Sequence, residues 1–61
     1  MSSKVRRLMN QAIAHADRMG WTVTGWHIQH RHDRDYFKGD FIVWYSTESG
    51  QKVAVIGNIY D

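Results

Sequence analysis

The residues with the greatest capacity for chemistry lie in one segment, HIQHRHDRD, at positions 27–35. His30 and His32 are two residues apart, so on a strand their side chains point to the same face of the sheet. A His-x-His pair on a strand can bind a metal, and Asp33 or Asp35 could supply a third ligand. Two histidines fall short of the usual number of ligands, and a polar strand end rich in His and Arg explains them more simply. We therefore treat His30 and His32 as weak metal candidates and predict no metal and no cofactor.

The same histidines could act in general acid–base catalysis with a nearby carboxylate such as Asp40. One helix on a small sheet leaves little volume for a substrate pocket, which typically measures about 300 Å³ or more. The chain shows no nucleophile with an adjacent base, and its 5 glycines are scattered rather than gathered in a phosphate loop. We therefore predict that the protein is not an enzyme and has no small-molecule substrate.

Length and composition indicate one small domain covering residues 1–61. A chain of this length buries only about 60% of its unfolded surface, and its core should supply no more than about 3–5 kcal/mol of stability. The absence of cysteine excludes disulfides and fits a reducing compartment. No apolar run approaches the ~20 residues of a membrane span, and the N-terminal segment does not resemble a signal peptide. We expect a cytoplasmic protein with no membrane partner.

An amphipathic helix is predicted over residues 4–19, because apolar side chains recur there at steps of three and four. Ser2 or Ser3 suits the N-cap, and Gly20 suits the left-handed position after the last helical residue. The apolar stripe consists of Val5, Leu8, Met9, Ala12, Ile13 and Ala16.

Three strands are predicted after the helix, over about 21–32, 36–46 and 52–60. A β-bulge at Thr24–Gly25 brings the apolar residues on both sides of it to one face of the first strand, since glycine inside a strand often marks a bulge. Short loops join neighbouring antiparallel strands. The predicted fold is therefore α+β, with one N-terminal helix packed on a three-stranded antiparallel meander sheet (α-β-β-β).

Residues 40–58 are apolar at odd and even positions alike, so both faces of the sheet need cover, and one helix can cover only one. A turn of even length within TESG places Trp44 opposite Val53 or Val55, whereas an odd length changes the pairing between the strands. We predict the even turn. We also predict that the face with Ile42 and Trp44 packs on the helix.

The opposite face is then open, and it is the reason to expect a binding protein. A contiguous apolar patch on a small monomer usually marks an interaction surface, although strand propensity alone also explains exposed Tyr and Val. The predicted partner-binding residues are Phe41, Val43, Tyr45, Ile56 and Tyr60 on this face, with Arg31, Arg34, Tyr36 and Lys38 on the charged hairpin.

We therefore expect a small non-enzymatic module that docks on a larger protein, or that self-associates as a homodimer through its open sheet face. Accessory proteins of phages and mobile elements that inhibit or modulate a larger partner are often this small. That analogy extends to size alone.

Nucleic-acid binding is the alternative function, because the net charge is +2 and the pI is about 9.3. Cationic side chains would contact phosphates, and aromatic residues on an open sheet would stack on unpaired bases. The acidic residues Asp33, Asp35 and Asp40 interrupt the basic hairpin, and an ordinary mixed-charge surface explains the same pattern. The candidate phosphate contacts are Lys4, Arg7, Arg18, Arg31, Arg34 and Lys38.

Overall fold

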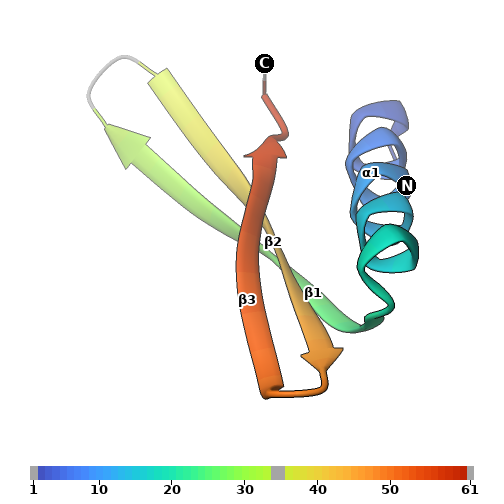
Figure 1. Cartoon of the computed structure of the whole chain (residues 1–61). Helices are drawn as coiled ribbons and strands as arrows, with labels where there is room; N and C mark the ends of the chain where they lie inside the picture. Colours follow the sequence, from blue (N-terminus) through green and yellow to red (C-terminus); the bar gives the residue numbers. More distant parts are fainter. Residues whose placement is uncertain (1, 34–35, 61) are drawn as a thin grey trace.

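The computed structural model describes residues 2–33 and 36–60, which form one helix followed by three strands (Figure 1). The elements are α1 (Ser3–Met19), β1 (Thr22–Asp33), β2 (Tyr36–Thr47) and β3 (Gly50–Asn58). The strands form one antiparallel sheet in the order β1-β2-β3. The predicted α-β-β-β architecture is confirmed.

Both ends of α1 are capped by the residues that the sequence indicates. The Ser2 side chain accepts a hydrogen bond from the Val5 backbone N–H at 3.2 Å. Gly20 has φ of 75°, in the left-handed region that favours glycine, and its N–H bonds back to the last turn. The buried stripe is narrower than predicted, because Ile13 is 44% exposed. Its members are Val5, Leu8, Ala12 and Ala16.

The predicted β-bulge in β1 is confirmed. Val23 pairs with Tyr45 and the next paired residue, Gly25, lies opposite Trp44, so Thr24 has no partner in the ladder. The extra residue shifts the alternation of side chains by one position. Trp26 therefore lies on the same side of the sheet as Val23, although the two are three residues apart.

The predicted even turn is also confirmed. Thr47 pairs with Gly50 across a two-residue turn, and Trp44 lies opposite Val53. A second bulge occurs at Ile56 in β3, and the strand ends at Asn58 rather than continuing to residue 60.

The predicted face assignment is wrong: α1 covers the opposite side of the sheet. Phe41, Val43 and Tyr45 are all 0% exposed and form the core with the buried stripe of α1. On the other side, Val53 and Val55 are 55% and 63% exposed.

The physical reason is the shape of the helix stripe. Its last two members, Ala12 and Ala16, are small, so the large rings of Phe41 and Tyr45 can pack beneath the helix. The Tyr45 hydroxyl donates a hydrogen bond to the Ala12 carbonyl at 3.4 Å, which satisfies it in the core. Burial also raises the pKa of Tyr45 above 10.0.

The β1–β2 hairpin extends beyond the helix (Figure 1). A helix of 17 residues is about 26 Å long, whereas a strand of 12 residues is about 40 Å long, so α1 cannot cover the full length of β2. The molecule is accordingly elongated, with dimensions of 41 × 22 × 15 Å. We call residues 29–33 and 36–40, which form the far end of this hairpin, the arm.

Candidate functional site

Large aromatic side chains are exposed on the helix side of the sheet, where the hairpin leaves α1. Alternation along β1 and pairing with β2 place these residues on one face. Trp26 is 46% exposed, Phe37 is 64% exposed and Tyr60 is 54% exposed. We call this set the aromatic surface, and it consists of Trp26, Ile28, His30, His32, Phe37 and Tyr60.

Each exposed ring of the aromatic surface is held by a neighbouring ring. Trp26 stacks on the buried ring of Phe41, with 5.7 Å between centroids and 26° between planes. Phe37 stacks on His32 at 4.6 Å and 23°. These contacts fix the rings before any partner arrives, which lowers the entropic cost of binding.

The chain end completes the aromatic surface. The Ile59 N–H donates to the Gly39 carbonyl at 2.8 Å, and the Asn58 side-chain oxygen accepts from the N–H groups of Gly39 and Tyr60 at 3.3 and 2.9 Å. The Tyr60 hydroxyl then hydrogen-bonds His30 Nδ1 at 3.2 Å. Gly39 is required for this approach, because a Cβ atom there would lie 2.6 Å from Ile59 Cγ1.

The uncovered side of the sheet carries a second apolar patch. Ile42 and Trp44 of β2 are half-buried, and they lie beside the exposed Val53 and Val55 of β3. The His27 ring packs near Trp44, with 6.4 Å between centroids. We call this side the open face.

Polar side chains lie at the two ends of the open face. Arg31, Lys38 and Asp40 lie on the arm, where Arg31 Nη2 is 3.0 Å from Asp40 Oδ2. Ser46 and Gln51 pair with each other near the β2–β3 turn. The apolar residues thus occupy the middle of the open face.

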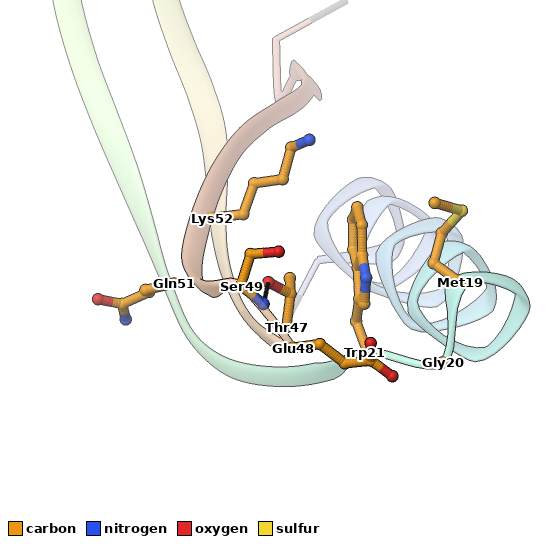
Figure 2. A pocket seen from close by; sticks show the side chains of 8 residues that line it. All are labelled: Met19, Gly20, Trp21, Thr47, Glu48, Ser49, Gln51 and Lys52. Carbon is orange, nitrogen blue, oxygen red and sulfur yellow. Dashed lines mark hydrogen bonds between the residues drawn. The ribbon is translucent and has the colours of Figure 1, made fainter.

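A groove of about 450 Å³ lies between the end of α1 and the β2–β3 turn (Figure 2). The Trp21 ring stands in it, and Lys52 Nζ is 5.2 Å from the centre of that ring. The Thr47 hydroxyl donates to the Gly50 carbonyl at 2.6 Å and accepts from the Ser49 N–H at 3.2 Å. These hydrogen bonds stabilise the β2–β3 turn. The groove is separate from the aromatic surface and the open face, and we do not assign it a function.

Because α1 covers the face opposite to the predicted one, some of the predicted partner-binding residues are buried. Phe41, Val43 and Tyr45 are buried beneath α1 and cannot contact a partner in the folded chain. Ile56 is half-buried against the same core. Tyr60 is exposed, as a binding residue requires.

The hairpin residues of that prediction are placed only in part. Arg31 and Lys38 are exposed on the open face. Arg34 and the side chain of Tyr36 lie outside the described residues.

The predicted phosphate contacts do not form one site with the exposed rings. Lys4, Arg7 and Arg18 are distributed along α1, from its first turn to its last. Arg31 and Lys38 lie on the arm, but on the face opposite to the aromatic surface. The structure therefore separates these cations from the rings that would stack on bases.

The two metal candidates share a face, but each has another contact. His30 bonds Tyr60, and His32 stacks on Phe37. Over residues 2–33 and 36–60, no three His, Asp or Glu side chains are placed to hold a metal ion.

The helix found in the described part of the chain is too short and too polar to cross a membrane.

Trp26 and Phe37 are candidate binding residues that sequence reasoning missed. Phe37 comes two residues before Gly39 and four before Phe41 in β2, so alternation alone places it on the same face as Phe41. The difference in length between a helix of 17 residues and a strand of 12 indicates that such a residue would be uncovered.

Comparisons of this chain with protein-family models, with curated proteins and with solved structures found no match.

Proposed function

We propose that the protein is a small protein-binding module that docks on a larger partner through its aromatic surface. The observation that carries this proposal is the exposure of three large aromatic side chains, between 46% and 64%, on one side of the sheet. Trp26 and Phe37 belong to the β1–β2 hairpin, and Tyr60 contacts it from the chain end. Trp and Tyr are enriched among the residues that contribute most to binding at protein interfaces. An apolar patch of this kind on a small chain usually marks such an interface.

The geometry supports an insertion mode of binding. The β1–β2 hairpin extends beyond α1 (Figure 1), and its exposed rings are held in place by ring contacts, Trp26 by Phe41 and Phe37 by His32. A partner with an apolar cleft would accept Phe37 and Trp26, while the polar edges of His30, His32 and Tyr60 contact the rim. Aromatic anchors within a polar rim are the usual anatomy of a protein interface.

Affinity capture from cells that produce the protein tests this proposal when variants are compared side by side. Wild-type chain should retain a protein that Trp26→Ala and Phe37→Ala lose, while circular dichroism shows an unchanged fold. Val55→Ala on the open face is the matched control and should retain it. If the aromatic variants retain every protein that the wild type retains, the proposal is wrong.

Nucleic-acid binding is the second candidate, and it has support from the same exposed rings. Bases would stack on Trp26, Phe37 and Tyr60, and Arg31 and Lys38 on the opposite face of the arm would contact phosphates. Because Arg31 is paired with Asp40, we rank this function below protein binding. A retarded band with single-stranded oligonucleotide that fades steeply with salt would reverse the ranking.

A further inference from the structure

Strand β1 forms one free edge of the sheet, because the strand order is β1-β2-β3. The hydrogen bonds of Gly39 show which backbone groups of β1 point out of that edge. The Gly39 N–H donates to the Asn58 side chain and its carbonyl accepts from the Ile59 N–H, so both groups point away from β1. Residues directly opposite in an antiparallel pair exchange both hydrogen bonds or neither. His30 lies opposite Gly39, so the N–H and carbonyl of His30 also lie outside the ladder.

The exposed rings and the unpaired backbone groups of β1 belong to the same residues. The orientation of His30 recurs at every second residue, and so do the side chains on the helix side of the sheet. The residues with outward backbone groups are Trp26, Ile28, His30 and His32. Over the part of the chain that the structure describes, no strand lies beside this edge.

The flank of α1 on the β1 side is apolar. Leu8 approaches Gly57 of β3, so the opposite flank of the helix stripe faces β1. Helical spacing places Met9 and Ile13 on that flank. Met9 is half-buried and Ile13 is 44% exposed. A strand added beside β1 would therefore have apolar neighbours on the helix side.

We propose that an extended segment of the partner protein adds to β1 as a fourth, antiparallel strand. This inference rests on the proposed function, since it names the part of the partner that lies beside Trp26. A row of backbone donors and acceptors at a sheet edge is a template for another extended chain. Neither a helix nor a nucleic acid presents such a row.

The two sides of β1 determine the side chains of this segment. Its residues on the helix side lie beside Trp26 and Ile28 and are apolar. Its residues on the other side lie beside His27, Gln29 and Arg31. The net charge of the chain is +2, so polar and acidic side chains suit these positions.

Strand β3 forms the other edge and is less suited to strand addition. It has 9 residues against 12 in β1, and the bulge at Ile56 interrupts its edge. Bulges are among the features that keep other chains from pairing with an edge strand. The bulge of β1 lies near its beginning, at Thr24, and the pairing from Gly25 to Asp33 is regular.

A peptide of about ten residues that alternates valine and glutamate is the probe, because it has the side-chain alternation of the proposed strand. NMR of the labelled chain should show amide exchange at Trp26, Ile28 and His30 slowed at least about tenfold by the peptide, since these N–H groups become bonded. In an antiparallel pair, the valines facing Trp26 and Ile28 direct their own N–H groups at β1. Methyl groups on the valine nitrogens should abolish binding, whereas methyl groups on the glutamate nitrogens should leave it unchanged.

Two variants at one position separate the backbone from the side chain. His30→Pro and His30→Ala both lose the imidazole, but only proline removes the outward N–H. Proline is accepted on edge strands at such positions, so the fold should survive, as circular dichroism would show. His30→Pro should bind the peptide at least about tenfold more weakly than His30→Ala does.

Three results would overturn strand addition: no slowed exchange at about 1 mM peptide, equal binding of the two methylated peptides, or equal binding by His30→Pro and His30→Ala. The proposed function is tested separately, by protein capture with Trp26→Ala and Phe37→Ala. Capture that depends on these rings but not on the His30 N–H would leave the docking surface in place and exclude the added strand.

Discussion

The part of the sheet under α1 and the arm beyond it share strands β1 and β2, yet their large aromatic side chains differ in exposure. Phe41 and Phe37 lie on the same face of β2, and they are 0% and 64% exposed. Tyr45 and Tyr60 differ in the same way, at 0% and 54%. The residue types are alike, so exposure here is decided by whether a helix lies above the side chain.

The region under α1 and the arm contribute differently to the stability of the fold. A chain of this size has a small core, and that core is confined to the part of the sheet that α1 covers. The arm places its apolar rings where they add little to folding. This position outside the core is the basis of our proposal that these rings contact a partner.

The largest expected difference between the two regions is that between the two phenylalanines. Phe41→Ala removes a fully buried ring and should cost about 3–5 kcal/mol, which is comparable to the whole stability of a domain of this size. Phe37→Ala removes an exposed ring and should cost less than about 1 kcal/mol. Circular dichroism in urea, at low protein concentration, should show Phe41→Ala largely unfolded in buffer and Phe37→Ala close to wild type. Equal losses in both variants would contradict the division into core and arm.

Local patterns in the sequence predicted most of this architecture. The helix ends, the bulge at Thr24–Gly25 and the two-residue turn each depend on a few adjacent residues, so they can be read along the chain. The fold of Asn58 back onto Gly39 was missed, because its hydrogen bonds join groups 19 residues apart.

The covered face could not be predicted from hydrophobicity, because both sets of residues in β2 are apolar. The choice depends on shape: Ala12 and Ala16 leave room for the Phe41 and Tyr45 rings, and this complementarity appears only when helix and sheet are placed together. Three of the predicted binding residues, Phe41, Val43 and Tyr45, were misplaced for the same reason, since they lie on the face that α1 buries. Tyr60 remains a candidate binding residue, because it follows β3 at the chain end and is exposed.

Two glycines give the next largest expected difference. A Cβ atom at Gly57, under α1, would lie 2.8 Å from Leu8 Cδ2, and Leu8 is only 5% exposed, so its side chain has little room to move. Gly57→Ala should therefore cost about 1–3 kcal/mol, as overpacking of a core does. Urea unfolding of this variant measures the loss directly.

The matched change on the arm is Gly39→Ala, where the new Cβ would lie 2.6 Å from Ile59 Cγ1 and 3.0 Å from Tyr60 Cε2. Ile59 is half-buried against the core and its N–H is bonded to Gly39, so the new Cβ fits only if the short chain end moves away as a unit. Because this segment is terminal, the cost in stability should stay below that of Gly57→Ala, at about 1 kcal/mol. The NMR contact between His30 and Tyr60 should be lost instead. A stability loss for Gly39→Ala as large as for Gly57→Ala would show that the chain end belongs to the core.

The smallest expected difference is between the two tyrosines, and it depends on pH. Burial raises the pKa of Tyr45 above 10.0, so the unfolded chain loses the Tyr45 proton at a lower pH than the folded chain does. The stability that depends on neutral Tyr45 is therefore complete below about pH 10 and is lost as the pH rises toward the folded-state pKa. Tyr45→Phe should flatten this alkaline decline. It should also cost about 0.5–1.5 kcal/mol near neutral pH, because the hydrogen bond to Ala12 is lost.

Tyr60→Phe is the control for this experiment, since Tyr60 is 54% exposed and its hydroxyl contacts His30 of the arm. Urea midpoints measured between about pH 8 and about pH 11, a range that spans the ordinary tyrosine pKa, should fall with the same slope for Tyr60→Phe and for wild type. Other groups also titrate in this range, so the informative quantity is the difference in slope between each variant and wild type. If Tyr45→Phe declines as steeply as wild type, the core does not hold the Tyr45 hydroxyl in its neutral form. The position of α1 would then explain why Tyr45 is buried and Tyr60 is exposed, but it would not explain a raised pKa of Tyr45.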